Sequence, residues 1–370
     1  MQNSQLETDL PPALPIINEM PPTLFGETDQ AELLGRSYTF RFKGNASEYF
    51  GIWIVNILLT IITIGFYAPW AKVRRLRYFY GNTWVFQRRF DFTGLPTKIL
   101  VGRIIALVVY GGFSLAVKYS WEAFLAGFVL IFFAVPWLIR STIRFRARNS
   151  KFSNSRFFFS GTNKSAYWCF AKCLAVVVFT LGLFTPVAVW LYKRECLNHL
   201  YLGQLKFSLN ASWGDYMRAM YMPLFVFIGG IAVLSILMAI LFGSSDGLNP
   251  AYYVFLMAAA YFLGYMFIWP LTAARLFITT WNNTTLSRSQ FQTNCNQWRY
   301  AWIVLSNWFA KVISLGLLTP WAVVRLYKYQ TESLRLMLVD DPDQLQNQMQ
   351  QDHNAIAEEL SDIFDLDISL

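Results

Sequence analysis

The chain has 370 residues, of which 55% are hydrophobic, 18% aromatic and only 14% charged, with a formal net charge of +9. Ordinary soluble domains carry roughly 25% charged residues. This composition therefore excludes a disordered chain, a disulfide scaffold and almost any water-soluble enzyme. It predicts an all-α polytopic membrane protein with internal repeats.

The charges are segregated along the chain. All 31 Lys and Arg residues lie between Arg36 and Arg335, a stretch that holds only seven of the 22 acidic residues. Residues 1–35 carry six acids and residues 336–370 carry nine, in both cases without a Lys or Arg. Either these acidic ends keep an apolar protein soluble, or they fold back on the basic body as an electrostatic cover that salt would weaken.

Charge and repeats together divide the chain into five parts. The predicted parts are an acidic, Pro-rich N-terminal arm (1–35), a first membrane repeat (36–161), a second membrane repeat (162–294), a third partial repeat (295–335) and an acidic C-terminal tail (336–370).

Seven segments are apolar enough to enter a bilayer, for which a full span needs about 20 residues. They are 52–71, 99–117, 124–139, 173–191, 222–242, 252–274 and 312–324. The second and third form one predicted hairpin and the fifth and sixth another, and the positive-inside rule places their cationic flanks in the cytoplasm. Segments 52–71, 173–191 and 312–324 do not fit a simple alternation in which every segment crosses the membrane once and all cationic linkers stay in the cytoplasm. They either re-enter or lie shallow, which keeps every cationic linker cytoplasmic, or they cross fully.

Short motifs recur along the chain at fixed offsets, which indicates an internal repeat. The motif F-x-F-[TS]-G occurs at 90–94 and 157–161, with a related copy at 40–44 and weaker echoes at 207–210 and 291–294. Because its aromatic and polar positions alternate as in a β-strand, we expect these pieces to form a small cytoplasmic β element. An Asn followed by a small polar residue comes 13 residues after Pro69, Pro136 and Pro270.

Three of the apolar segments contain a Gly followed four residues later by a Pro. These candidate helix-break hinges are Gly65 and Pro69, Gly182 and Pro186, and Gly316 and Pro320. Gly ends helices readily and Pro suits the first turn of the next one, for which Thr185 and Thr319 are predicted N-caps. Each break is either a turn from a membrane helix to a surface helix or a discontinuous helix that lines a solute path.

Cationic helices with interleaved aromatic residues follow the prolines. The candidate cluster for anionic headgroups is Lys72, Arg74, Arg75, Arg77, Arg140, Arg144 and Arg148. Ordinary positive-inside anchoring or specific capture of anionic lipid both explain this pattern, and we expect no binding of nucleic acid. Lys172 and Lys311, at the edges of apolar segments, either snorkel to the interface or attract anions.

Residues for catalysis or metal binding are sparse. The chain has only two His residues, and none of the seven apolar segments contains an Asp or Glu. Its four cysteines form no C-x-x-C pair. The sequence therefore predicts no catalytic residue, no cofactor, no metal site and no enzymatic activity, with enzyme action on lipids as a distant third possibility.

At several of these motifs the chain resembles the YjgN-like bacterial inner-membrane proteins, a family of unknown function. The resemblance rests on 48–50, 67–83, 92–94, 136–137 and 144–149, and it covers roughly residues 36–335. It implies a multi-pass protein of the bacterial inner membrane, and it transfers no catalytic or binding residue.

The favoured interpretation is a non-enzymatic membrane scaffold that engages anionic lipid headgroups, or a protein partner, through its cationic aromatic helices. Membrane lipids are the expected partners, and a further protein or a second copy is possible. The alternative is a transporter or channel for an anionic or amphiphilic solute that uses the broken helices.

Overall fold

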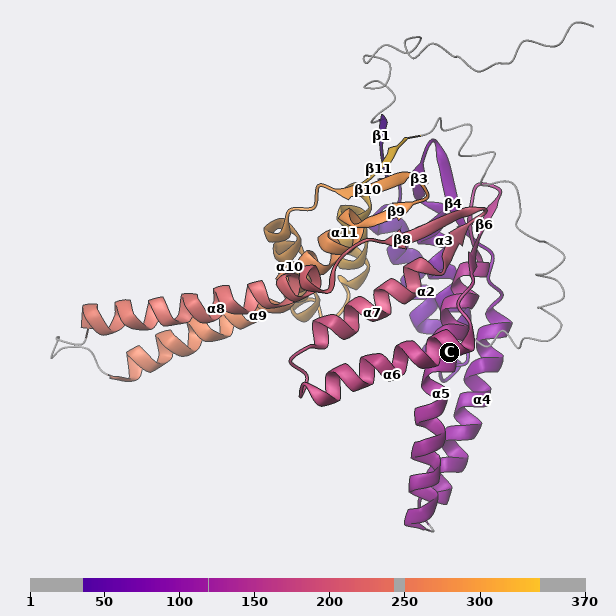
Figure 1. The fold of residues 1–370 in the computed structure, drawn as a ribbon, viewed down its shortest axis with the longest axis horizontal. Coiled ribbons are helices and arrows are strands. Elements are labelled where there is room, and N and C mark those ends of the chain that lie inside the picture. Colours follow the sequence, from indigo (N-terminus) through magenta and orange to yellow (C-terminus); the bar gives the residue numbers. More distant parts are fainter. Residues whose placement is uncertain (1–35, 119, 243–249, 340–370) are drawn as a thin grey trace, which may run out of the picture.

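The computed structural model describes residues 36–118, 120–242 and 250–339 (Figure 1). The acidic N-terminal arm and all but the first four residues of the acidic C-terminal tail lie outside this range, so the interpretations of both tails stay predictions.

Within the described residues, the order strand, helix, helix, strand occurs five times. The first unit is β1 (Arg36–Thr39) and β2 (Arg41–Phe42), α2 (Ala46–Ile62), α3 (Ala68–Gly81) and β3 (Thr83–Val85). The second is β4 (Arg88–Phe92), α4 (Pro96–Ala116), α5 (Trp121–Arg148) and β5 (Ser150–Phe152). The third is β6 (Ser155–Phe159), α6 (Asn163–Phe179), α7 (Thr185–Asn198) and β7 (Leu200–Leu202). The fourth is β8 (Leu205–Leu209), α8 (Trp213–Phe242), α9 (Pro250–Asn282) and β9 (Thr284–Leu286). The fifth is β10 (Ser289–Thr293), α10 (Gln297–Ile313), α11 (Thr319–Glu332) and β11 (Leu334–Leu338).

The strands form one antiparallel sheet that nearly closes into a barrel. Its eleven described strands follow the order β1-β11-β10-β9-β8-β7-β6-β5-β4-β3-β2. Only Phe40 separates β1 from β2, so the same stretch of chain pairs with β11 on one side and with β3 on the other. The prediction of an all-α protein with a small β element is therefore wrong. The F-x-F pieces do become strands, but each pairs with a second strand of three to five residues, too short to show a periodic pattern in the sequence.

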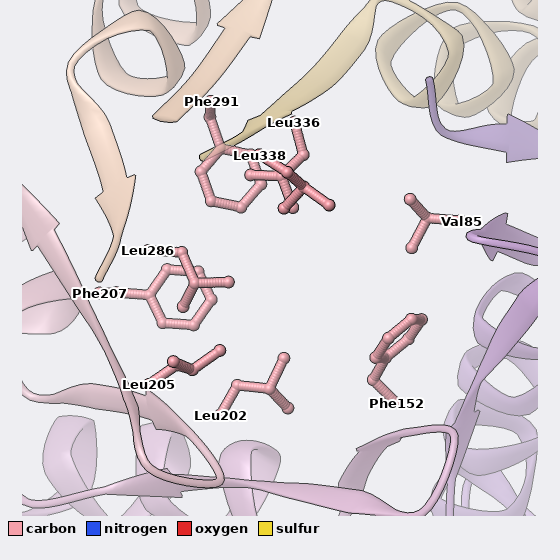
Figure 2. Packing of buried hydrophobic residues seen from close by; sticks show 9 residues of the cluster. All are labelled: Val85, Phe152, Leu202, Leu205, Phe207, Leu286, Phe291, Leu336 and Leu338. Carbon is pink, nitrogen blue, oxygen red and sulfur yellow. The ribbon is translucent and has the colours of Figure 1, made fainter. Parts of the chain in front are cut away.

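The inside of the barrel is filled with aliphatic and aromatic side chains. Figure 2 shows nine of them, which come from β3, β5, β7, β8, β9, β10 and β11. Five Phe rings, one from each unit, form a closed circuit in which neighbouring centroids are 6.0–6.4 Å apart. They are Phe40, Phe90, Phe157, Phe207 and Phe291. Each is the first aromatic residue of its F-x-F motif or echo, so this repeated position packs the barrel axis.

The glycine of the motif makes room for the second aromatic ring. A Cβ atom on Gly94 would lie 2.5 Å from the ring of Phe92, and the same overlap occurs at Gly161 with Phe159. Both rings are buried. At these two positions the backbone can pass close to the ring because glycine has no side chain.

The repeated Asn and hydroxyl pair ends three helices. The Nδ2 of Asn82, Asn149 and Asn283 each donates to the carbonyl four residues earlier. The hydroxyl of the following Thr or Ser donates one residue further along the same last turn. Because both side chains satisfy carbonyls at a helix C-terminus, this dipeptide sets the point where each helix passes into a strand.

The helices form two long hairpins and three short ones. In the described residues four helices are long and apolar enough to cross a membrane, in segments 96–116, 121–148, 213–238 and 254–282, and they belong to the long hairpins α4–α5 and α8–α9. Figure 1 shows both long hairpins extending away from the sheet in different directions. The short hairpins are α2–α3, α6–α7 and α10–α11, whose helices have 17 and 14 residues each.

The position of proline explains the two lengths. Pro69, Pro186 and Pro320 are the second residue of α3, α7 and α11. Pro136 lies inside α5, where residues 121–135 precede it, and Pro270 lies inside α9. The long hairpins thus continue well beyond the level at which the short hairpins turn.

Candidate membrane-facing site

The three short hairpins turn in the same way. In the first, Thr63 ends α2, Ile64 has a φ of 50° and Gly65 a φ of 89°. Leu181 with Gly182 and Leu315 with Gly316 repeat this left-handed pair. Glycine adopts such a φ without steric cost. The candidate hinges therefore lie in tight turns between two antiparallel helices.

The apolar residue beside each glycine is almost fully exposed. The relative exposed area is 90% for Ile64, 96% for Leu181 and 94% for Leu315. Other large apolar side chains of the same turns, such as Phe179 and Ile313, are also exposed. Exposure of these apolar side chains to water is unfavourable, whereas the acyl layer of a membrane accommodates them.

The predicted N-cap role of Thr185 and Thr319 is wrong. Each hydroxyl instead donates to the carbonyl of the preceding turn glycine, Gly182 or Gly316. A residue before the glycine performs the bridging function: the Oγ1 of Thr180 accepts from the backbone N–H of Phe184. The side chain of Thr180, which precedes the turn glycine, thus stabilises the turn.

Three of the four candidate cations on α3, Arg74, Arg75 and Arg77, are exposed, and two of these three also make hydrogen bonds. Arg75 is exposed, with its guanidinium 6.0 Å from the ring centroid of Phe79. Arg77 donates to the carbonyls of Phe92 and Gly94, which ties α3 to the end of β4. Lys72 is half-buried.

An Asn–Arg clasp, which the sequence did not reveal, joins the two helices of the first and last short hairpins. Arg74 donates to the Oδ1 of Asn56 at 3.3 Å, and Arg325 donates to that of Asn307 at the same distance. Both Asn side chains are buried. In the sequence, each of these Asn residues lies 13 residues before the proline that follows the turn, and this shared spacing could have indicated the pair. In the middle hairpin Cys173 occupies the corresponding position.

None of the three candidate cations on α5 is exposed. Arg140 donates to the carbonyl of Gly161 at 2.7 Å, at the start of α6. Arg144 is buried and Arg148 is half-buried. These side chains are therefore less exposed than an interfacial cation cluster requires.

The two candidate anion-attracting lysines lie at different places. Lys172 is exposed on α6, with its ammonium 5.2 Å from the ring centroid of Trp168. Lys311 lies in the last turn of α10, where its positive charge suits the negative end of the helix dipole. The structure does not bring the two lysines together.

A cavity of about 320 Å³ lies between α5, α6 and α7. Three thiols line it, those of Cys169, Cys173 and Cys196, and so do Arg140 and Glu195. Burial raises the pKa of the Cys196 thiol to about 11, so this thiol is protonated at neutral pH.

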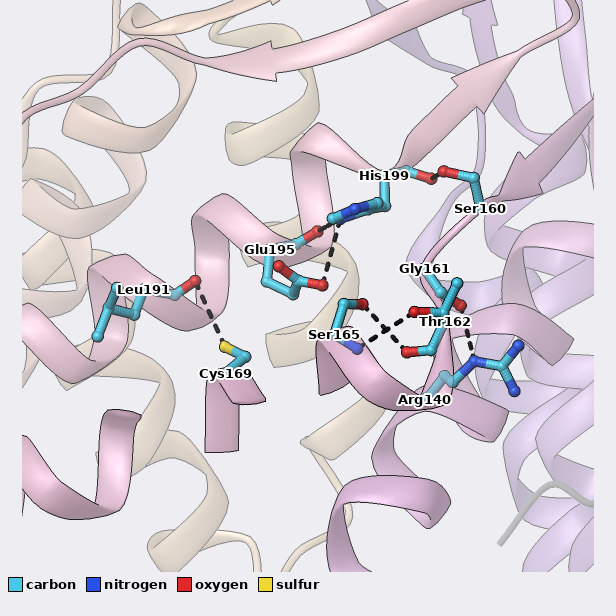
Figure 3. Close-up of polar contacts among 9 residues, drawn as sticks. All are labelled: Arg140, Ser160, Gly161, Thr162, Ser165, Cys169, Leu191, Glu195 and His199. Atoms are coloured by element: carbon cyan, nitrogen blue, oxygen red, sulfur yellow. Dashed lines mark hydrogen bonds and ion pairs between the residues drawn. The ribbon is translucent and has the colours of Figure 1, made fainter. Parts of the chain in front are cut away.

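Polar contacts border this cavity, as Figure 3 shows. The carboxylate of Glu195 lies 3.3 Å from the Nδ1 of His199, and the thiol of Cys169 points to the carbonyl of Leu191. No group of three or more His, Cys, Asp or Glu side chains able to hold a metal ion occurs in the described part of the chain. The sequence did not reveal this cavity, because its residues come mostly from three helices whose packing against one another has no sequence pattern.

A family model for bacterial proteins of unknown function (DUF898) matches residues 37–363. The chain belongs to this family. Its resemblance to YjgN-like proteins is confirmed by relatives named inner membrane protein YjgN. The chain is 33% identical to the protein of Escherichia coli strain K12 and 32% identical to that of strain O157:H7, over 135 residues in each case. The protein of Salmonella typhimurium is 26% identical over 133 residues.

These matches cover 36% of this DUF898 chain and 33–34% of each relative, so the matched region spans about a third of the relatives' length. No solved structure matches the chain.

Proposed function

We propose that this DUF898 protein is a non-enzymatic scaffold of the bacterial inner membrane that gathers anionic lipids around its cytoplasmic barrel. The names of its relatives and its four membrane-length helices support the location. The long hairpins anchor the protein across the bilayer, and the short hairpins insert their tips from one side.

One observation carries the proposal: each short hairpin has an exposed apolar tip and places cations behind it on the returning helix. In the first hairpin Ile64 forms the tip and Arg75 lies seven residues into α3, about 10 Å along its axis. In the middle hairpin Leu181 forms the tip, and Lys193 and Arg194 are exposed on α7. This separation matches the distance between the acyl layer and the phosphate groups in an interfacial anchor.

A pair of matched double variants tests the proposal. Arg75→Gln with Lys193→Gln removes two cations of the hairpin helices, and Arg89→Gln with Arg156→Gln removes two exposed cations of the barrel wall. Each protein is reconstituted into nanodiscs that contain spin-labelled phosphatidylglycerol or phosphatidylcholine, and the fraction of immobilised lipid is measured. We expect the hairpin variant to lower the preference for phosphatidylglycerol by about fivefold for each cation removed, since a cation near the surface contributes roughly 1 kcal/mol.

The barrel-wall variant should retain the wild-type preference. An equal loss in both variants would attribute the preference to net charge alone and reject the role of the hairpins. A transporter, the alternative function, predicts instead that sealed vesicles containing the protein release a trapped anion, which the scaffold does not predict.

A further inference from the structure

The outer face of the barrel has cations at a repeated position. The residue before each Phe of the inner circuit points to the outer face, because successive side chains of a strand alternate. In three β-hairpins that follow one another in the sheet, this residue is an exposed cation: Arg89, Arg156 or Lys206. Each is the second residue of its strand and therefore lies close to the turn. In the fourth hairpin an exposed cation, Arg288, lies in the turn itself.

These four residues, the turn-end cations, have no acidic neighbours on the barrel. The described strands contain one acidic residue, Asp91. No ion pair joins a turn-end cation to a carboxylate within residues 36–118, 120–242 and 250–339. The barrel thus has a row of like charges around one end, and such a row attracts a segment of the opposite charge.

Both ends of the described chain lie at the same end of the barrel as the turns. In each unit the helices join the strands at one end, so the turns between units lie at the other. There the last strand ends at Leu338, which pairs with Arg36 of the first strand. Met337 pairs with Gln290, which comes two residues after Arg288. The chain beyond residue 339 therefore begins beside a turn-end cation.

The C-terminal segment 340–370 has the charge and the length to cover these cations. Its 31 residues include nine acids and no Lys or Arg. Arg89, on β4, is the most distant turn-end cation, seven strand spacings from β11 or about 34 Å along the sheet. An extended chain of this length spans up to about 100 Å. Because the segment is tethered, its local concentration is high, and several individually weak surface ion pairs suffice to hold it.

We propose that residues 340–370 dock on the turn-end cations and cover this end of the barrel. The N-terminal arm is the other acidic segment that begins here, but it has six acids in 35 residues. Asp340 and Asp341 also follow the sheet directly, whereas the arm's last acid, Glu32, lies four residues before it. The docked segment closes this surface to other anionic partners. This inference goes beyond the proposed function and does not depend on it.

The mobility of the C-terminal segment tests the inference. The four native cysteines of the full-length protein are replaced by serine or alanine, and Ser361→Cys receives a nitroxide spin label. The protein is purified in a neutral detergent without lipid, and electron paramagnetic resonance separates immobilised from mobile label. We expect the immobilised form to dominate at about 50 mM NaCl. Its ratio to the mobile form should fall at least fivefold at about 500 mM NaCl, because salt screens exposed ion pairs.

Two triple variants with the same change of charge identify the surface. The test variant replaces three cations of the barrel by Gln, at Arg89, Arg156 and Lys206. The control variant replaces three exposed cations of the helices by Gln, at Arg75, Lys164 and Lys193. At about 50 mM NaCl the test variant should lower the ratio of immobilised to mobile label about fivefold or more, since it removes three ion-pair partners. The control variant should stay within about twofold of the wild type. Circular dichroism confirms that both variants fold.

Three outcomes overturn the inference. Equal losses in the two triple variants would mean that net charge holds the segment and that the turn-end cations are not its binding surface. An immobilised label that responds neither to salt nor to the test variant would place the segment elsewhere on the protein. A label at Ser361→Cys that is mobile at both salt concentrations would show that the segment does not dock. If a label at Ser4→Cys is then immobilised, the N-terminal arm occupies this surface instead.

Discussion

The ring of Phe40 lies against the ring of Phe291, with 6.4 Å between their centroids, although the two residues come from the first and the last units of the chain. Phe40 also donates its backbone N–H to the carbonyl of Leu334 in β11. The first strand thus brings the sheet close to a closed barrel and completes the Phe circuit at the same residue. Near-closure leaves few unpaired strand edges, which would otherwise be sites of aggregation.

Phe40→Ala should lower the free energy of unfolding by on the order of 2–3 kcal/mol, because it removes a half-buried ring from the circuit at the barrel seam. The measurement is thermal unfolding of the purified protein in detergent, followed by circular dichroism. Thr39→Ala is the control, since Thr39 is exposed on the same stretch. A midpoint for Phe40→Ala equal to that of Thr39→Ala would show that the seam does not limit stability.

Gly94→Ala should destabilise the protein by about 1–3 kcal/mol, because a new Cβ atom overlaps the buried ring of Phe92. Gly81→Ala is the control. Gly81 lies in α3, and a Cβ atom there meets nothing within 4 Å. Alanine favours helix by about 1 kcal/mol over glycine, so this change should be neutral or stabilising. The same thermal unfolding assay compares the two variants, and equal midpoints would contradict the packing role of Gly94.

The sequence predicted the strands that carry two aromatic residues and missed their partners. The piece at 90–94 shows the alternation of a half-buried strand over five residues. Thr83–Val85, the strand that pairs with it, has three residues and directly follows a helix. So short a strand leaves no period to detect. The Asn–Thr pair at the start of this strand was visible in the sequence. Its role at the end of the preceding helix follows only from hydrogen bonds that the structure shows.

The sequence predicted the positions of the hinges in the candidate site, but it did not predict the contacts between its helices and strands. A Gly four residues before a Pro carries information about local backbone, and the turns lie where the sequence placed them. The bonds from Arg77 to the carbonyls of Phe92 and Gly94, and the cavity between α5, α6 and α7, depend on how these elements pack against one another. No spacing within one helix reports such packing between helices. Arg144 shows the same limit from the other side, because its position four residues from Arg140 did not reveal that it is buried.

Cysteines placed at the hairpin tips should resist a water-soluble maleimide while the protein remains in its membrane. The four native cysteines, Cys169, Cys173, Cys196 and Cys295, are first replaced by alanine or serine. Leu181→Cys and Leu315→Cys then carry single thiols at almost fully exposed positions. Because the tips insert into lipid under the proposed function, labelling should rise at least fivefold after the protein is unfolded in a denaturant, which exposes these thiols to water.

The control thiol is Gln204→Cys, in the exposed turn between β7 and β8. It should react fully in inside-out vesicles and poorly in intact cells, since the barrel is expected on the cytoplasmic side. Fast labelling of Leu181→Cys in intact membranes would remove the basis for the shallow insertion of the short hairpins. Labelling of Gln204→Cys from outside intact cells would reverse the sidedness of the whole protein.

The stability of the protein should fall as pH rises from about 10 to about 12, in part through Tyr78. Its hydroxyl donates to the carbonyl of Asn45 at 2.7 Å and accepts from the same residue's N–H at 2.9 Å. Burial, and then the charge of Glu48, raise the pKa of Tyr78 from 10.0 to about 12.

The sign follows from linkage between protonation and folding. The folded state holds the Tyr78 proton more tightly than the unfolded state does, so the stabilisation is complete below pH 10 and is lost as pH approaches 12. Tyr78→Phe has no proton to lose at this position. Its unfolding midpoint should be lower than that of the wild type at pH 8, by the loss of a buried hydrogen bond, and should decline less steeply between pH 10 and 12. Parallel midpoint curves for the two proteins over that interval would mean that Tyr78 ionises equally easily in the folded and unfolded states. The hydrogen bonds between Tyr78 and Asn45 would then not stabilise the first unit.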